Sequence, residues 1–139
     1  MLQRLIYCSD REDGGDLAAL LATAAHRNKG RGVTGLLIAD ARSFLQVLEG
    51  ERATLAALFQ TIARDPRHSR VTLVSVEDIR SQSYPAWGMS QIADVAKIAA
   101  MWWKTGAERP FDPHAMSAQE VQNFLRLASF ELMSAGPTP

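Results

Sequence analysis

The sequence contains a single cysteine, Cys8, and no group of cysteines and histidines at metal-binding spacing. It therefore cannot form an internal disulfide bond, and we expect no metal site. A lone cysteine fits a reducing compartment, so we expect a cytoplasmic protein. The sequence also lacks a run of about 18 apolar residues and a basic-then-apolar signal layout at its N-terminus, which argues against a membrane span and against export.

Net charge and enzyme motifs are also missing. Fifteen basic and fifteen acidic residues cancel, so no overall field is available to hold nucleic acid, and no nucleic-acid partner is expected. An RNA-binding module of similar layout would expose aromatic residues on its central strands, whereas Leu45 and Val47 are aliphatic. No GxSxG, HExxH or phosphate-binding glycine loop occurs. An acylphosphatase-type enzyme would need an anion-binding loop, and the loop at residues 10–15 is acidic, so we expect no enzymatic activity.

The 139 residues, 47% hydrophobic and 22% charged, are typical of one globular domain. Short apolar or alternating segments predict strands at residues 2–9, 33–40, 43–49, 71–76 and 87–92. Apolar residues three and four positions apart predict one helix from residue 16 to about residue 27, and another between Gly50 and Pro66. This order of elements predicts an α+β fold of ferredoxin-like type, with both helices on one face of the sheet.

The second face of the sheet also needs cover. Two further helices are expected there, at residues 94–105 and 117–134. The first carries an apolar stripe that includes Trp102, and the second opens with a capping box from Ser117 to Glu120. We therefore expect one domain made of a core and a C-terminal helical extension, at residues 1–93 and 94–139.

Two polar side chains are expected on the face that the first two helices cover. Gln46 shares its face with Phe44 and Leu48, and Tyr7 shares its face with Leu5. Either residue alone is most simply a structural one, bonded to the backbone or to water. An unpaired buried polar group costs about 1–3 kcal/mol, so each must find a partner. Together they favour a planar heterocycle enclosed between the sheet and the helices.

The end of the first predicted helix is rich in charge. Lys29 and Arg31 are explained by the helix dipole, which favours cations at this end. Asn28 differs, because its amide offers the donor and the acceptor that an imide-like ring edge requires. Residues 64–68, at the end of the second helix, are most simply a surface turn.

Taken together, these segments resemble the BLUF family of blue-light sensors that use a flavin. The motifs that carry the resemblance are Leu5-Ile-Tyr7-Cys-Ser9, Asn28, Val33-Thr-Gly-Leu-Leu37, Phe44-Leu-Gln46-Val-Leu-Glu-Gly50, Asp65-Pro-Arg-His68 and Trp87-Gly-Met89. Each motif is weak alone, but their joint order and spacing from residue 5 to residue 89 are specific.

The resemblance implies a blue-light photoreceptor that binds a flavin without a covalent bond. The flavin would be FAD, with FMN or riboflavin as alternatives. By the same resemblance, Tyr7 is the photo-oxidisable tyrosine, Gln46 lies between it and the N5/O4 edge of the flavin, and Asn28 binds the imide edge. Asp65 and His68 match positions that line the flavin and its ribityl chain.

Arg27 and the last strand complete what the resemblance implies. Arg27 stands where several family members have Asn or His, so it could approach the ribityl or phosphate end of the cofactor. Light would draw an electron and then a proton from Tyr7, and Gln46 would rearrange by rotation, tautomerisation or both. Trp87 or Met89 would relay this change to the C-terminal helices, where a downstream partner protein would read it. A homo-oligomer is compatible with this scheme. The alternative is a cofactor-free ferredoxin-like regulatory or protein-interaction domain.

Overall fold

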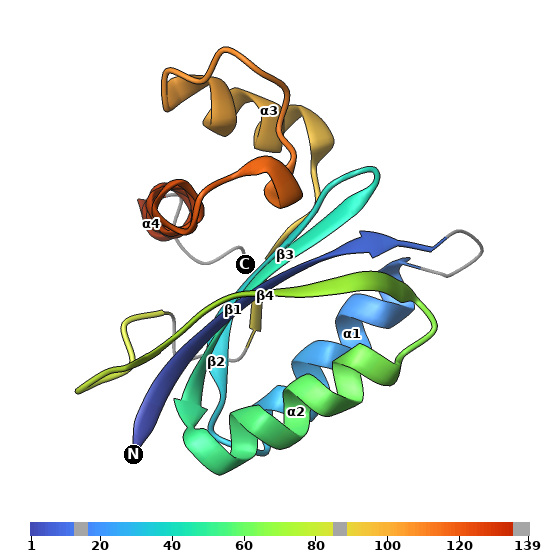
Figure 1. The fold of residues 1–139 in the computed structure, drawn as a ribbon, viewed down its shortest axis with the longest axis vertical. Helices are drawn as coiled ribbons and strands as arrows, with labels where there is room; N and C mark the ends of the chain where they lie inside the picture. The colour runs from blue at the N-terminus through green and yellow to red at the C-terminus, as the bar shows by residue number, and fades with distance from the viewer. Residues whose placement is uncertain (13–16, 85–88, 135–139) are drawn as a thin grey trace.

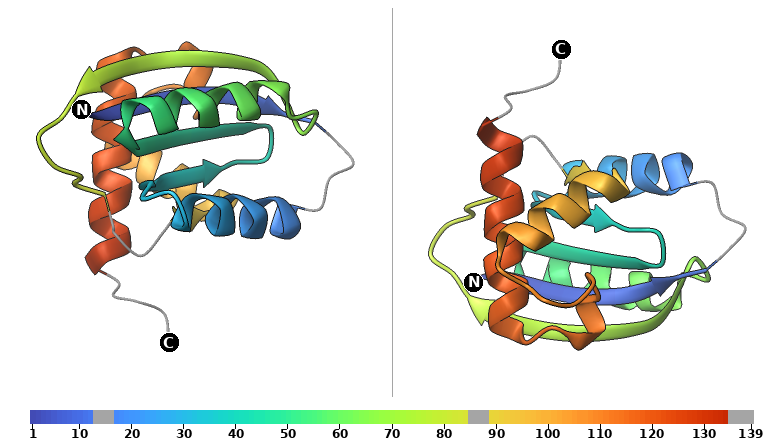
Figure 2. Two further views of the ribbon diagram at one scale, coloured as in Figure 1. Left: turned by 90° about the horizontal axis from the view of Figure 1, so that it is seen from below. Right: turned by 90° about the horizontal axis from the view of Figure 1, so that it is seen from above.

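The structure is a computed structural model that describes residues 1–12, 17–84 and 89–134. Its elements in chain order are β1 (Leu2–Arg11), α1 (Leu17–Lys29), β2 (Thr34–Ala39), β3 (Ser43–Glu51), α2 (Arg52–Arg64), β4 (His68–Asp78), β5 (Met89–Ile92), α3 (Val95–Lys104), a short 3-10 helix (Pro113–Ala115) and α4 (Ala118–Ser134). The five strands form one sheet in the order β4-β1-β3-β2-β5. Helices α1 and α2 cover one face of the sheet and helices α3 and α4 the other (Figure 1), as the opposite views in Figure 2 also show. The predicted α+β, ferredoxin-like fold is confirmed.

β1 and β3 carry buried side chains on both faces of the sheet. β1 pairs antiparallel with β3 and β4, β3 pairs antiparallel with β2, and only β5 joins in parallel, beside β2. Gly35 allows β2 and β3 to approach closely, because a Cβ atom there would lie 1.9 Å from the carbonyl oxygen of Val47. Gly35 also faces Met89 in the parallel ladder. A larger residue at position 35 would therefore disturb the site where β5 joins the sheet.

Each face of the sheet has its own hydrophobic cluster. The residues of the α1/α2 cluster are Leu5, Tyr7, Leu21, Val33, Leu37, Ala39, Phe44, Leu48, Leu55, Leu58 and Ile62. The α3/α4 cluster contains Ile6, Cys8, Leu45 and Val47 from the central strands, packed against helix residues such as Trp102 and Phe124. The alternation along β3 therefore divides its side chains between the two faces as predicted. Among the described residues, no helix is long and apolar enough to cross a membrane.

Some predicted boundaries were wrong. β4 runs from His68 to Asp78 instead of residues 71–76, and β1 continues to Arg11 instead of ending at residue 9. These two strands extend each other, because Arg11 pairs with His68 across the sheet. Residue 68 thus begins a strand and is not part of a surface turn. Residues 87 and 88 of the fifth predicted strand lie outside the described residues, and β5 is described from Met89.

The start of α4 follows its predicted capping box. The backbone N–H of Glu120 donates to Ser117 Oγ at 3.1 Å, and the backbone N–H of Ser117 donates to Glu120 Oε1 at 3.1 Å. Both bonds satisfy donors that the first turn of a helix leaves unpaired. The cap fixes where α4 begins and therefore which side chains it turns toward the sheet.

Candidate functional site

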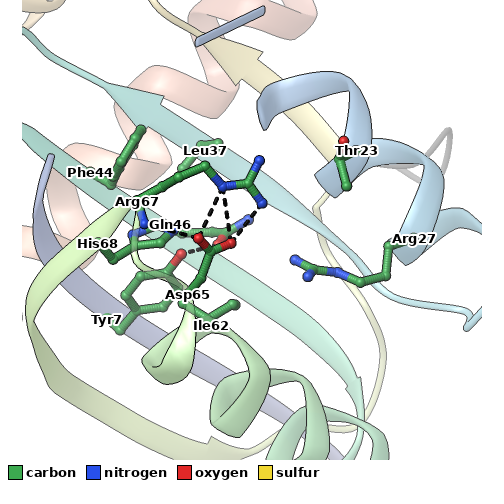
Figure 3. A pocket seen from close by; sticks show the side chains of 10 residues that line it. All are labelled: Tyr7, Thr23, Arg27, Leu37, Phe44, Gln46, Ile62, Asp65, Arg67 and His68. Carbon is green, nitrogen blue, oxygen red and sulfur yellow. Dashed lines mark hydrogen bonds and ion pairs between the residues drawn. The ribbon is translucent and has the colours of Figure 1, made fainter. Parts of the chain in front are cut away.

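A pocket opens between the sheet and the ends of α1 and α2 (Figure 3). The residues that line it are Tyr7, Thr23, Arg27, Leu37, Phe44, Gln46, Ile62, Asp65, Arg67 and His68. Its cavity volume is about 20 Å³, enough for about one water molecule. A planar heterocycle can enter only if side chains that line the pocket move.

Tyr7 and Gln46 form the buried polar pair of this pocket. They face each other across β1 and β3 in the antiparallel ladder, and the Tyr7 hydroxyl donates a hydrogen bond to Gln46 Oε1. The exposed fractions of the two residues are 1% and 3%. Burial raises the pKa of the Tyr7 phenol well above its ordinary value, so the phenol keeps its proton at neutral pH.

His68 is the first residue of β4, the strand that pairs with β1 on the side opposite to β3, and its side chain reaches into the pocket. Its Nδ1 and Ser9 Oγ are joined by a hydrogen bond of 2.8 Å, and its ring packs against Phe44 with centroids 4.8 Å apart. Burial lowers the pKa of His68 below its ordinary value. The imidazole is therefore neutral at neutral pH and can offer one donor and one acceptor.

Asp65 and Arg67 form an ion pair at the turn between α2 and β4. Arg67 Nη2 lies 2.6 Å from Asp65 Oδ2, and the Arg67 backbone N–H donates to Asp65 Oδ1 at 2.9 Å. These hydrogen bonds from Arg67 hold the pKa of Asp65 at about 2. The carboxylate is therefore ionised at neutral pH and remains on one side of the pocket.

Arg27 and Asn28 carry polar atoms that no described residue satisfies. Arg27 extends from α1 toward Asp65 in Figure 3, and its buried Nε has no hydrogen-bond partner. Burial, followed by the positive charge of Arg31, lowers the pKa of Arg27. Asn28 is 1% exposed, and its Oδ1 likewise accepts no hydrogen bond from the described residues. Such atoms are costly unless a ligand or water pairs with them.

The structure brings most of the predicted site residues together. Five of them line the one pocket: Tyr7, Arg27, Gln46, Asp65 and His68. Asn28 is buried beside Arg27 in α1 but does not line the pocket. Trp87 lies outside the described residues, and Met89 is described only through its backbone, which pairs with Gly35.

Sequence reasoning missed Arg67 and Ser9 as parts of the site. Arg67 stands two residues after Asp65, a spacing that allows the bidentate pair, but residues 64–68 read as a surface turn. Ser9 reaches His68 only because β1 and β4 pair, and the sequence does not give that register. Cys8 belongs to the α3/α4 cluster on the opposite face from Tyr7, because neighbouring residues of a strand point to opposite faces of the sheet.

Comparison with known proteins finds a matching family and the same fold. A family model described as "BLUF: Sensors of blue-light using FAD" matches residues 2–90. The solved structure of BlsA in its photo-activated state aligns with a TM-score of 0.82 at 28% identity, covering 100% of this chain and 99% of that one. The dark-state structure of BlrB, a BLUF protein, aligns with a TM-score of 0.76 at 23% identity, over 94% of this chain and 96% of that one, and supports the fold.

Two curated relatives are larger proteins. The photoactivated adenylate cyclase subunit beta of Euglena longa is 35% identical over 80 residues, which are 57% of this chain and 9% of that protein. The blue light- and temperature-regulated antirepressor BluF of Escherichia coli (strain K12) is 34% identical over 74 residues, 51% of this chain and 18% of that protein. The matched parts are thus only a small share of each of these two relatives.

Proposed function

Because the chain belongs to the BLUF family of blue-light sensors that use FAD, we propose that it senses light through a flavin held against Tyr7 and Gln46. The observation that carries the proposal is the buried hydrogen bond from the Tyr7 hydroxyl to Gln46 Oε1 in the pocket. A phenol and an amide on neighbouring strands are an electron donor and a reorientable hydrogen-bonding group in direct contact. No sequence feature favours the cofactor-free regulatory domain over this function.

The donors and acceptors that line the pocket, together with Asn28 beside it, fit a flavin. Asn28 Oδ1 is a buried acceptor without a partner, as the imide N–H of the ring requires. Arg27 offers an unpaired buried N–H beside the pocket for the ribityl or phosphate part. Asp65 and His68 line the same space. Arg27 is the side chain that can move to admit the ring, because its Nε forgoes no hydrogen bond when it moves.

The chain's own residues define how a light signal would begin. Bound flavin supplies the chromophore that absorbs blue light and, once excited, oxidises a nearby donor. Tyr7 is the nearby donor, and its proton lies on the bond to Gln46 Oε1, so the proton can leave along that bond. Gln46 can respond by rotation, by tautomerisation or by both, because its amide presents a different group at each edge. The two groups are shielded from water, so the new hydrogen-bond pattern can persist.

The bound flavin is proposed to be FAD, with FMN or riboflavin as alternatives, and a flavin that carries phosphate is favoured over riboflavin. Arg27 is the basis for this preference. The positive charges of Arg31 and Arg67 act on Arg27, and the negative charge of Asp65 opposes them. Because Asp65 is paired with Arg67, Arg27 and Arg31 are left as two neighbouring positive charges. A phosphate group would neutralise this excess of positive charge, and riboflavin has none.

The output is proposed to pass from β5 to the C-terminal helices and then to another protein. Trp87 and Met89 are the relay candidates, and β5 leads within three residues to α3. We propose that residues 1–93 form the flavin-binding core and that residues 94–139 form an extension within the same domain. A downstream protein would read the change, since we propose that this chain has no enzymatic activity of its own. The single, buried Cys8 supports a reducing, cytoplasmic location.

The test is an absorption spectrum of the full chain before and after blue light. Wild-type protein reconstituted with FAD should show a reversible red shift of the flavin bands. Gln46→Leu and Tyr7→Phe should each still bind FAD but lose the persistent shifted state, because one lacks the amide and the other lacks the hydroxyl proton. A normal red shift in either variant would show that the assigned residue is the wrong one.

The attachment of the pigment is tested on the same samples. Denaturation should release the flavin intact, and Cys8→Ala should leave the photoreaction unchanged, because Cys8 lies on the opposite face of the sheet. Protein that remains colourless after incubation with FAD, FMN and riboflavin would support the cofactor-free alternative.

A further inference from the structure

Glu49 is a buried carboxylate outside the pocket. It is 0% exposed, and it lies on β3 on the face opposite to Gln46, close to the end of the strand. A charge that is fully removed from water is costly unless several partners compensate it. The partners of Glu49 therefore indicate what the residue does.

Three of the partners belong to the connection between β4 and β5. The backbone N–H groups of Ser83 and Tyr84 both donate to Glu49 Oε1, at 2.7 Å and 2.8 Å. The Ser83 hydroxyl donates to Glu49 Oε2 at 3.2 Å. The fourth partner is Arg4 on β1, whose Nη2 lies 2.8 Å from the same oxygen. One carboxylate thus joins the two central strands to the segment that precedes β5.

A second side chain fixes the same segment. Gln82 Nε2 donates to the backbone oxygens of Gly32 and Glu49, at 3.1 Å and 3.0 Å, and to Thr34 Oγ1 at 2.9 Å. Gln82 is exposed, so its side-chain amide supports the segment from the solvent side. The segment before β5 is therefore fixed to β3 and to the start of β2 by two independent sets of hydrogen bonds.

The register of the sheet relates Glu49 to the photoactive pair. Arg4 faces Glu49 and Tyr7 faces Gln46 on the same two antiparallel strands. The two cross-strand pairs are three residues apart, about 10 Å along the strands, and they lie on opposite faces. A change in how β1 and β3 are held at Tyr7 and Gln46 therefore acts on the same two strands that hold Arg4 and Glu49.

Tyr84 continues the connection to α4. Its ring is buried in the α3/α4 cluster, together with Leu125 and Ala128 of α4, and the guanidinium of Arg4 lies 6.0 Å from its centre. The backbone N–H of the same residue is held by Glu49. A displacement of residues 83 and 84 would therefore shift β5, which follows them in the chain, and also α4, which shares the cluster with Tyr84.

We propose that Glu49 is a positioning residue that couples β3 to the segment before β5 and, through Tyr84, to α4. This inference rests on the proposed function, because it concerns how the change at Gln46 leaves the pocket. Glu49 does not touch the flavin site: its carboxylate lies on the other face of the sheet. It sets the dark-state position of residues 83 and 84, and the light signal reaches α4 through that position.

Glu49→Gln separates coupling from photochemistry. The amide keeps the volume of the side chain, but four donors converge on the carboxylate and an amide has one acceptor oxygen. The NH2 group of the new amide must point, donor against donor, either at Arg4 or at the two backbone N–H groups. Glu77→Gln is the matched control, because Glu77 also binds Arg4, at 2.9 Å, but its side chain is partly exposed and forms no hydrogen bond with residues 82–84.

The measurement is amide hydrogen exchange of the full chain loaded with FAD, in the dark and under blue light. Glu49→Gln should keep the red shift but raise dark exchange at Ser83 and Tyr84 by about ten- to a hundredfold. It should also reduce the light-minus-dark difference in α4 by half or more, and Glu77→Gln should do neither. Gln82→Ala, a change at an exposed residue, should show a smaller effect of the same kind and serves if Glu49→Gln does not fold.

The outcomes distinguish this inference from the proposed function. If the wild-type protein shows no red shift, the proposed function fails. If the wild-type protein shows the shift and both Glu49→Gln and Gln82→Ala retain the full light-minus-dark difference in α4, the coupling role of Glu49 is wrong. Should Glu49→Gln abolish the red shift itself, Glu49 would belong to the photochemical site and not to its output.

Discussion

Removing both partners of the Tyr7–Gln46 hydrogen bond should lower the free energy of unfolding by less than the sum of the two single removals. Tyr7→Phe deprives the Gln46 carbonyl of its phenol donor, and Gln46→Leu leaves the Tyr7 hydroxyl without its acceptor. Both residues are buried, so each single change should cost about 1–3 kcal/mol, the price of an unsatisfied buried polar group. The double variant leaves neither group behind. We therefore expect its cost to fall short of the sum of the single costs by about 1–2 kcal/mol.

Urea unfolding of the flavin-free full chain, followed by far-ultraviolet circular dichroism, measures the four free energies. Any other hydrogen bond of the Gln46 amide is lost equally in both variants that carry Leu, so it cancels in the cycle. Tyr84→Phe provides the control, because Tyr84 is a buried tyrosine of the opposite face, and its cost should add to that of Gln46→Leu. Additivity of Tyr7→Phe and Gln46→Leu to within about 0.5 kcal/mol would refute a direct hydrogen bond between the two side chains.

Three further predictions concern the pocket and the second face. Arg67→Ala should lower stability at neutral pH by about 1 kcal/mol, since the exposed half of the pair is screened by water. Arg67 depresses the pKa of Asp65 to about 2, so the stabilisation is present above about pH 4 and is lost toward pH 2; thermal unfolding across this range should show a shallower acid loss in the variant. Arg27→Gln should weaken FAD and FMN binding about tenfold and riboflavin binding little, as measured by fluorescence titration; equal losses for all three would contradict a phosphate contact. Truncation before Asp94 should expose the α3/α4 cluster and cause aggregation in size-exclusion chromatography, whereas a monomeric, equally stable fragment would contradict the two-face arrangement.

The sequence predicted β3, in the middle of the sheet, better than the edge strand β4. β3 starts at Ser43 as expected and ends two residues later than predicted. The strand was recognisable because its side chains alternate between two hydrophobic clusters. β4 is an edge strand, and its register with β1 shifts at two places. Such irregularities break the period of two, and the length of β4 then depends on how far β1 extends beside it. That information resides in the pairing and not in the segment itself.

The site residues that could be predicted are those whose orientation follows from their own strand alone. Tyr7 and Gln46 stand out because each interrupts an apolar row, and the face of each follows from its position in the strand. The contact of Ser9 with His68 depends on the β1–β4 register, and the pair formed by Asp65 and Arg67 depends on the turn after α2. Sequence periodicity carries neither kind of information, so these contacts emerge only once the chain is folded.

Glu49 interrupts the apolar pattern of β3 as clearly as Gln46 does, and its energetics point to a different use. A buried ion pair adds little stability over apolar side chains of similar volume. Removing one partner of such a pair nevertheless lowers the free energy of unfolding by about 3–5 kcal/mol. The pair of Glu49 with Arg4 therefore stabilises one arrangement of the chain relative to others more than it stabilises the fold as a whole. The arrangement in question is that of Ser83 and Tyr84, whose backbone N–H groups complete the carboxylate's partners. In the proposed coupling, a light signal that reaches α4 needs such a defined starting position, because a segment that already samples many positions would change little if Gln46 rearranged.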